Sequence, residues 1–510
     1  MARALIGSAG LLLMAACHPA GSFPPPPMTA PPGWNTESYS VIDENAFRAV
    51  EHEPLSTFSV DVDRASYSNV RRFLVEGRRP PRDAVRIEEM INYFPYDHPE
   101  RSGDHPITVA TEVADAPWRA GHRLVRIGLH TAPVDMRDAP AANLVFLVDV
   151  SGSMSSGDRL PLVKRSLRLL VQQLRPRDRV AIVVYAGAAG LVLPPTTGSE
   201  RAKILDAIER LETGGSTAGG AGLRLAYEVA RRHHVEGGNN RVILASDGDF
   251  NVGVSSDAEM VRLIEEKREQ GTFLTVLGFG RGNLKDSKME QLADRGNGNY
   301  AYIDNLLEAR KVLVSEMGGT LLTVAKDVKL QVEFNPARVR AYRLIGYENR
   351  LLANQDFNDD TRDAGEMGAG HTVTALYEIV PVGVSTDVVI RGVDSLRYRA
   401  PAPLAPTAAG GGELAFVKIR YKLPDGDTSR LMQHAVRDGT GAASRDLTFA
   451  AAVAGFGMLL RESQHRGTLT IDEVIRLADG SRGPDPDGYR AEFVRLARLF
   501  GEMGSRDEGR

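Results

Sequence analysis

Two features are scarce in this 510-residue chain: cysteine, which occurs once as Cys17, and long hydrophobic segments. A single cysteine excludes a disulfide framework. After residues 1–17, no apolar run reaches the roughly 20 residues that a helix needs to cross a bilayer. Positive charge is not in excess, because the net charge is −4, so the composition gives no reason to expect nucleic-acid binding. The rest is typical of a soluble globular protein, and the length predicts about three domains.

The N-terminus carries a short apolar segment. Residues 1–17 begin with a positive charge, continue with an apolar core over 4–16 and end at Cys17. This pattern predicts a secretory signal peptide, because the core is too short for a membrane-spanning helix. The junction Leu-Met-Ala-Ala-Cys resembles a bacterial lipobox, with Met14 where Leu is usual, and it predicts lipid attachment at Cys17. An ordinary signal cleaved near Ala16 is the alternative.

Proline is concentrated directly after the cysteine. Residues 18–44 contain Phe-Pro-Pro-Pro-Pro and Ala-Pro-Pro-Gly, a composition typical of an extended tether without a core. A tether attached to a lipid on Cys17 predicts a protein of the bacterial cell envelope whose folded part lies outside the cytoplasm. His18 stands where some bacteria read Asp as a signal for inner-membrane retention. This favours the outer membrane over the outer face of the cytoplasmic membrane.

Residues 143–320 alternate predicted strands with predicted helices. The strands are apolar on both faces, and amphipathic helices separate them. This order predicts an α/β fold, Rossmann-like and doubly wound, in which helices cover both faces of a mainly parallel sheet. The expected strands are 144–149, 179–185, 241–246, 273–279 and 300–303, and the expected helices are 160–174, 200–211, 221–234, 257–269, 286–295 and 306–318.

The sequence on either side of this domain favours antiparallel strands. Residues 45–142 and 321–440 contain short apolar alternations separated by turns. We expect them to form one β-sandwich-like domain, with the α/β domain inserted between its parts. Residues 441–510 are predicted to be helical, and a capping box at Thr470 opens one helix. The expected strands outside the α/β domain are 57–63, 107–113, 124–130, 328–334, 339–344, 373–379, 388–398 and 415–421.

The first strand of the α/β domain ends in the motif Asp149-Val-Ser151-Gly-Ser153. Its one carboxylate and two hydroxyls are spaced so that their oxygens can converge on one point. Oxygen ligands are the set that Mg²⁺ or Ca²⁺ prefers. The loop lies at the carboxyl end of a buried strand, where open α/β sheets bind ligands. The motif therefore predicts a divalent-cation site.

Two further segments complete the candidate site. Thr217 lies in the segment Gly-Gly-Ser-Thr-Ala-Gly-Gly, just before a predicted helix, and Asp247 ends another buried strand. Both lie at the sheet edge that already bears Asp149. With these motifs in this order, residues 143–318 resemble a von Willebrand factor type A domain with a metal-ion-dependent adhesion site.

The resemblance implies different roles for the five residues of the motif. Ser151, Ser153 and often Thr217 bind the ion directly, whereas Asp149 and Asp247 act largely through water. Neutral oxygens leave a divalent cation under-neutralised, so an open coordination position favours a Glu or Asp side chain on a protein partner. Mg²⁺ suits such a site because it keeps several waters, and Ca²⁺ and Mn²⁺ are the alternatives.

Three flanking segments extend the resemblance over most of the chain. They read Phe-Ser-Val-Asp-Val-Asp-Arg-Ala-Ser-Tyr from residue 58, Arg-Ile-Glu-Glu-Met-Ile-Asn-Tyr-Phe from 86, and Gly-His-Thr-Val-Thr-Ala-Leu-Tyr-Glu from 370. These segments are similar to a family of bacterial envelope lipoproteins that pair a type A domain with a C-terminal domain of unknown function. The predicted function is a non-enzymatic, membrane-tethered module that binds an acidic group on a protein partner.

Two other functions remain open. One is an assembly or chaperone-like factor for an envelope complex, docked through the metal. The other is a hydrolase, which needs a general base near the ion, although no His or Glu closely follows the three ligand loops.

The pair Asp61-Val-Asp63 suggests a phosphatase, but the lysine and metal ligands of that chemistry cannot be placed. We expect it to be a strand end that leads into a helix N-terminus.

Other carboxylates in the sequence are weaker candidates for metal ligands. Asp249 lies in a segment that mimics the start of a calcium loop, but Val252 and Ala258 stand where an EF-hand needs Gly and Glu. Asp249 is therefore predicted only to tune the site from outside the ion's direct ligands. The carboxylates of residues 356–366 are expected in a solvated hairpin loop. A sharper hypothesis is that one of them occupies the metal site in cis.

Overall fold

The structure is a computed structural model. It describes residues 36–61, 63–99, 103–135, 137–215, 219–248, 250, 257–316, 322–362, 364–390, 411–439 and 442–507. Residues Thr36–Arg510 form one structural unit, separate from Met1–Asn35. The predicted signal peptide, Cys17 and most of the predicted tether lie outside the described residues. The predicted domain boundaries remain predictions.

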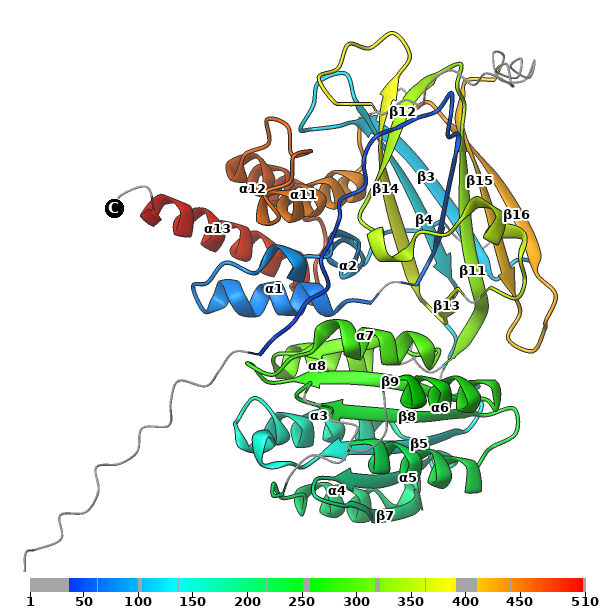
Figure 1. The fold of residues 1–510 in the computed structure, drawn as a ribbon, viewed down its shortest axis with the longest axis vertical. Helices are drawn as coiled ribbons and strands as arrows, with labels where there is room; N and C mark the ends of the chain where they lie inside the picture. Colours follow the sequence, from blue (N-terminus) through cyan, green and yellow to red (C-terminus); the bar gives the residue numbers. More distant parts are fainter. Residues whose placement is uncertain are drawn as a thin grey trace, which may run out of the picture. The chain divides into compact units, whose positions relative to one another are not determined.

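A six-stranded sheet forms the centre of the α/β domain, in the order β10-β9-β8-β5-β6-β7. Figure 1 labels β9, β8, β5 and β7 of this sheet. The first five strands in this order are parallel to one another, as predicted. Their bounds are β5 Ala142–Asp149, β6 Arg179–Tyr185, β8 Asn239–Ser246, β9 Thr272–Phe279 and β10 Tyr300–Ile303. β7 Ala189–Thr197, which is antiparallel to β6, is not among the strands expected from the sequence. It contains Pro194 and Pro195, which a sheet edge tolerates because one side of the strand needs no donors.

Helices cover both faces of this sheet, as predicted. Alternate residues of β5 point to opposite faces: Phe146 packs with α3, α4 and α8, and Leu147 packs with α5, α6 and α7. The last predicted helix is shorter than expected, because α8 passes into a π-helical turn, Lys311–Ser315. The helix bounds are α3 Leu160–Gln173, α4 Arg201–Glu209, α5 Gly219–Arg232, α6 Asp257–Glu269, α7 Asp286–Arg295 and α8 Leu306–Arg310.

Strands from before and after the α/β domain pair with each other, which confirms the predicted insertion. β4 Arg123–Thr131 lies beside β14 Thr372–Pro381, and β2 Leu55–Ser59 lies beside β11 Thr323–Phe334. Two sheets result, in the orders β1-β12-β14-β4-β3 and β13-β11-β15-β16. One core contains apolar side chains from both sheets. The other strands are β1 Arg48–Ala49, β3 Ile107–Asp115, β12 Val339–Ile345, β13 Gly365–Gly368, β15 Glu413–Lys422 and β16 Arg430–Arg437.

β16 is not among the strands expected from the sequence, and most of the predicted strand 388–398 lies outside the described residues. β16 is an edge strand with polar side chains on much of its length, so its apolar alternation is weak.

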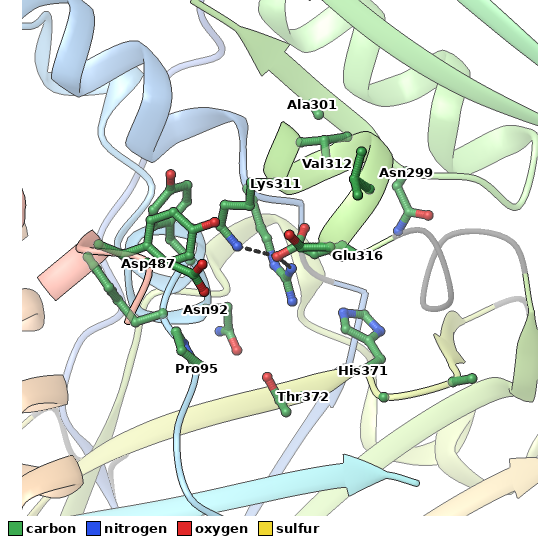
Figure 2. Close-up of a pocket in the computed structure, with 18 of the residues that line it drawn as sticks. Asn92, Pro95, Asn299, Ala301, Lys311, Val312, Glu316, His371, Thr372 and Asp487 are labelled. Atoms are coloured by element: carbon green, nitrogen blue, oxygen red, sulfur yellow. Dashed lines mark hydrogen bonds and ion pairs between the residues drawn. The ribbon is translucent and has the colours of Figure 1, made fainter. Parts of the chain in front are cut away.

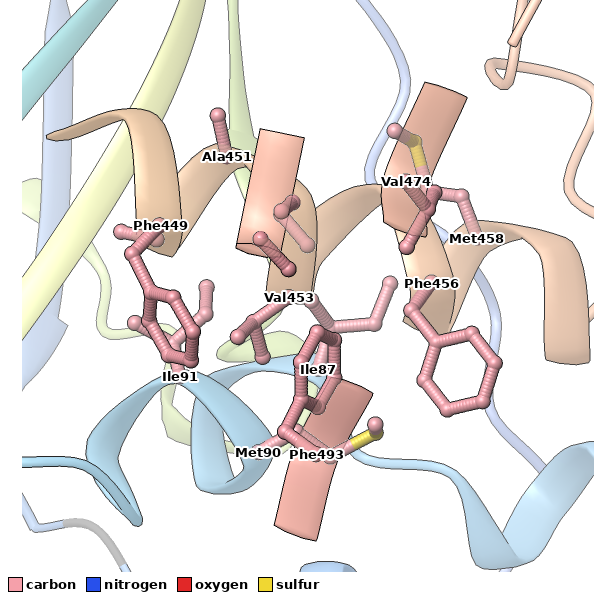
Figure 3. Packing of buried hydrophobic residues seen from close by; sticks show 14 of the residues in the cluster. Ile87, Met90, Ile91, Phe449, Ala451, Val453, Phe456, Met458, Val474 and Phe493 are labelled. Carbon is pink, nitrogen blue, oxygen red and sulfur yellow. The ribbon is translucent and has the colours of Figure 1, made fainter. Parts of the chain in front are cut away.

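The C-terminal helices share one apolar core with two helices near the N-terminus. α11 Arg445–Leu460, α12 Ile471–Gly480 and α13 Tyr489–Asp507 pack with α1 Ala65–Val75 and α2 Ile87–Asn92. Figure 3 shows Phe493 of α13 among apolar side chains of α2 and α11. The capping box at Thr470 is present as predicted. Within the described ranges, no helix is both long and apolar enough to cross a membrane.

Arg350 joins the α/β domain to the rest of the unit through four carboxylates. Its guanidinium nitrogens lie 3.0 Å from Asp61 and 3.2 Å from Asp63, which follow β2. They also lie 3.0 Å from Glu290 and 2.6 Å from Asp294, both on α7. The Asp61–Asp63 pair thus precedes α1, as expected, although β2 already ends at Ser59. Its described contacts are those of a structural ion-pair network.

Candidate metal centre

The predicted metal-site residues come from loops at the carboxyl edge of the parallel sheet. Asp149 is the last residue of β5, and Asp247 directly follows β8. β5 and β8 are adjacent and in register, with Val148 opposite Ala245. Because both strands run in the same direction, both carboxylates reach the same edge of the sheet, and each is fully buried.

Asp149 holds the loop that contains the two serines. Its Oδ1 accepts a hydrogen bond of 2.9 Å from the backbone N–H of Ser151, and its Oδ2 accepts one of 3.3 Å from the hydroxyl of Ser246. Burial raises the pKa of Asp149 to about 6, and the neighbouring charge of Asp247 acts in the same direction, whereas hydrogen bonds from Ser151 act against the rise. A cation beside this carboxylate would favour its ionised form.

The hydroxyls of Ser151 and Ser153 lie side by side, with their oxygen atoms 3.1 Å apart. Ser151 is buried and Ser153 is half-buried. Backbone hydrogen bonds from Gly152 to Gly215 (3.1 Å) and from Gly214 to Val150 (2.7 Å) join this loop to the glycine-rich segment. The glycine-rich segment that contains Thr217 is therefore hydrogen-bonded to the serine loop at Gly214 and Gly215. Thr217 itself lies outside the described residues.

Two residues that the sequence analysis missed contact Asp247. The side-chain amide of Asn283 donates to Oδ2 of Asp247 over 3.2 Å, and Nη1 of Arg159 lies 3.0 Å from the same oxygen. Arg159 precedes α3 and Asn283 lies in the loop between β9 and α7. Neither belongs to a recognisable motif, so only the fold brings them to Asp247. The predicted tuning residue Asp249 lies outside the described residues.

The described donor set fits a small, hard divalent cation. It offers two neutral hydroxyl oxygens and two carboxylates at the same edge of the sheet, which is the chemistry that Mg²⁺ accepts while keeping some of its water. No group of three or more His, Cys, Asp or Glu side chains is gathered for a metal among the described residues.

Comparison with known proteins places the chain in a family. The sequence profile described as "Uncharacterized protein YfbK, C-terminal" matches residues 319–503, and that described as "von Willebrand factor type A domain" matches 144–249. A profile described as "von Willebrand factor" matches 33–126. "Uncharacterized protein YfbK" of Escherichia coli (strain K12) is 45% identical over 471 residues, which cover 91% of this chain and 81% of that protein. The chain belongs to the YfbK family.

More distant relatives match this YfbK family member at lower identity. "Uncharacterized protein sll0103" of Synechocystis is 27% identical over 40% of this chain and 48% of that protein. Among solved structures, "von Willebrand factor type A from Catenulispora acidiphila" has a TM-score of 0.41 and 16% identity, covering 78% of this chain and 91% of that one. "Conserved hypothetical protein BatB from Bacteroides thetaiotaomicron" has a TM-score of 0.31 and 24% identity, covering 35% and 97%. The YfbK match and the type A profile confirm the resemblance to a type A domain joined to a C-terminal domain of an uncharacterised family. The metal-ion-dependent adhesion site stays a prediction.

The loop predicted to carry the carboxylates of residues 356–366 contacts strands of the β-sandwich-like domain. Lys329 on β11 donates to the backbone carbonyls of Asp356 and Asp359, and Lys422 on β15 donates to that of Asp360. The charge of Glu366 acts on Arg241, which lies near the amino end of β8, whereas Asp247 follows its carboxyl end. These contacts support a surface loop and argue against the hypothesis that it occupies the metal site in cis.

A cavity of about 530 Å³ lies where the α/β domain meets the other parts of the unit. Figure 2 shows Lys311 and Glu316 on one wall and His371 on another. Glu316 forms ion pairs with Arg64 and Lys311, and the Lys311 ammonium lies 4.6 Å from the ring centre of Tyr93. Burial lowers the pKa of His371 to about 3. The described cations of this cavity are paired within the protein, so we assign it a structural role.

Glu316→Gln is expected to destabilise the protein by about 1.5–3 kcal/mol at neutral pH, because it leaves Arg64 and Lys311 without their carboxylate. Although burial opposes ionisation, the charges of Arg64 and Lys311 hold the pKa of Glu316 at about 2. A lowered pKa stabilises the fold above the ordinary value of 4.5, and this contribution is lost as the pH falls toward 2. Urea unfolding at pH 7 and at about pH 3 measures the difference, which should shrink at the lower pH.

Glu413→Gln is the matched control, because Glu413 pairs with Arg437 at the surface. It should change the free energy of unfolding by less than about 1 kcal/mol at either pH. Equal effects of the two substitutions would contradict the role assigned to Glu316.

Proposed function

We propose that this YfbK family member is a cell-envelope lipoprotein that binds an acidic group on a protein partner through a divalent cation, in a non-enzymatic role. Asp149, Ser151, Ser153, Thr217 and Asp247 are the residues proposed to hold the ion. The observation that carries the proposal is the pair of serine hydroxyls, 3.1 Å apart, in a loop that Asp149 holds, with the buried carboxylates of Asp149 and Asp247 at the same carboxyl edge of the sheet. When bound, Mg²⁺ would supply a coordination position for an acidic side chain of the partner.

Each residue has a task that follows from its contacts. Asp149 fixes the backbone of Ser151, so the two hydroxyls are oriented before any ion arrives. Asn283 orients Asp247 in the same way. Preorganised ligands lose less conformational freedom on binding, and second-layer hydrogen bonds of this kind raise metal affinity. Because the proposed direct ligands are neutral hydroxyls, positive charge remains for the partner's carboxylate.

A pulldown with the full-length chain from solubilised envelope, with and without EDTA, tests this function. The wild-type chain should capture a partner only when divalent ions are present, and Ser151→Ala should capture none. Capture that survives EDTA would refute the proposed binding mode. Capture of many subunits of one envelope complex during its assembly would favour the alternative function, an assembly factor.

The proposed anchor gives a separate prediction. Cys17→Ser removes the thiol to which the proposed lipid would be attached. Because a lipid chain supplies the membrane affinity, we expect the variant to move from the membrane fraction to the soluble fraction of lysed cells. Fractionation followed by immunoblotting measures this. A variant that stays in the membrane fraction would show that Cys17 is not the anchor, and Ser8→Ala in the same N-terminal region is the matched control.

A further inference from the structure

Arg159 places a positive charge against the candidate metal site. Its Nη1 lies 3.0 Å from Oδ2 of Asp247 and also donates to the backbone carbonyl of Ser153. Its Nη2 donates to the backbone carbonyl of Arg281. The Arg159 side chain is 12% exposed and the Asp247 side chain is 0% exposed. One guanidinium therefore contacts three loops at this edge of the sheet, those that contain Ser153, Asp247 and Arg281.

The fold makes room for this side chain at Gly280. Gly280 has a positive φ of 73°, and a Cβ atom at this position would lie 2.4 Å from Cγ of Arg159. Any other residue there would displace the Arg159 stem. The stem of Arg159 thus lies against Gly280 while its guanidinium contacts Asp247.

The Arg159 guanidinium and a divalent ion would both be attracted to one carboxylate, that of Asp247. The oxygen of Asp247 that faces Arg159 also accepts from Asn283, so it is already fully engaged by donors. A divalent ion close to Asp247 would be repelled by the guanidinium, and the repulsion is strong in a site shielded from water. The ion therefore binds well only if Arg159 gives up its contact with Asp247.

We propose that Arg159 is a tethered cation that competes with the divalent ion for Asp247 and keeps the affinity of the site for the free ion low. This inference rests on the proposed function, because it concerns the regulation of the same site. It makes Arg159 a positioning residue, which acts on the ion through Asp247. Loading of the site then depends on the divalent-ion concentration around the protein.

Calorimetric titration of the full-length chain with Mn²⁺ tests the proposal. Arg159→Gln removes the charge and should tighten Mn²⁺ binding about tenfold, since one repulsive charge is lost. Arg159→Lys keeps the charge and should bind Mn²⁺ within about threefold of the wild type. Arg281→Gln is the matched control, because Arg281 is a nearby arginine whose half-exposed side chain pairs with Glu76 and Asp158. It should leave the affinity unchanged.

The outcomes separate this inference from the proposed function. If Arg159→Gln binds Mn²⁺ as the wild type does, or more weakly, while Ser151→Ala abolishes binding, the inference fails and the proposed function stands. If neither the wild type nor Arg159→Gln binds Mn²⁺, both fail. Should Arg159→Gln not fold, Arg159→Met takes its place, because it keeps an unbranched stem beside Gly280 without the charge. It should also tighten Mn²⁺ binding about tenfold.

Discussion

Ser151→Ala is expected to weaken Mn²⁺ binding about 100-fold or more, because it removes a proposed direct ligand where loss of a supporting residue alone costs 10- to 100-fold. The substitution deletes one hydroxyl from a buried position and leaves the backbone hydrogen bond to Asp149 in place. The fold should therefore survive. Isothermal titration with Mn²⁺ measures the affinity, and thermal unfolding without metal checks the fold.

Ser155→Ala is the matched control, since Ser155 lies in the same loop but is exposed. Its Mn²⁺ affinity should equal that of the wild type. Asp149→Ala should lose binding like Ser151→Ala, because it releases the Ser151 backbone and removes a carboxylate. Wild-type affinity in Ser151→Ala would show that the hydroxyl pair does not hold the ion.

Arg350→Met is expected to lower the free energy of unfolding by about 3–5 kcal/mol, because it leaves four mostly buried carboxylates without their shared cation. Asp61 and Asp63 belong to the segment before α1, and Glu290 and Asp294 belong to α7 of the α/β domain. The loss should therefore loosen the α/β domain from the rest of the unit. Urea unfolding measures the energy, and hydrogen exchange on α7 locates it.

The same substitution should change the dependence of stability on pH. Burial raises the pKa of Asp61 from 3.8 to about 8, even though the charge of Arg350 opposes the rise. A raised carboxyl pKa contributes stability that is present below pH 4 and lost as the pH rises toward 8. Without Arg350 the ionised carboxylates repel one another more strongly, so Arg350→Met should lose stability more steeply than the wild type over this range.

Arg437→Met is the matched control for Arg350, because Arg437 forms an exposed ion pair with Glu413. Its effect should stay below about 1 kcal/mol and should not vary between pH 5 and pH 8. An Arg350→Met protein as stable as this control at both pH values would contradict the role assigned to Arg350.

The fold was predictable from the sequence wherever the signal was local. Apolar runs such as 144–149 are buried on both sides, so their pattern identified the parallel strands and their order along the chain. The insertion followed from strands on both sides of the α/β domain. β7 was missed because its two prolines are acceptable only at an edge, and its edge position depends on the completed sheet.

The candidate site was predictable only in part, for a related reason. Asp149, Ser151 and Ser153 are two residues apart on one loop, so their proximity follows from the chain itself. Asp247 could be placed because adjacent parallel strands end at the same edge of a sheet. Arg159 reaches Asp247 by a side-chain conformation that depends on Gly280 and on the loop at Arg281. No sequence pattern predicts such a contact.

The central claim is tested most directly by crystals of the full-length protein soaked with Mn²⁺ and measured for anomalous scattering. We expect one strong peak between the hydroxyls of Ser151 and Ser153, at about 2.0–2.2 Å from each oxygen as for other small divalent ions. Asp247 should then lie nearby and the Arg159 guanidinium should have moved away from it. Mn²⁺ bound elsewhere in the chain, with no peak at the two serines, would contradict the account.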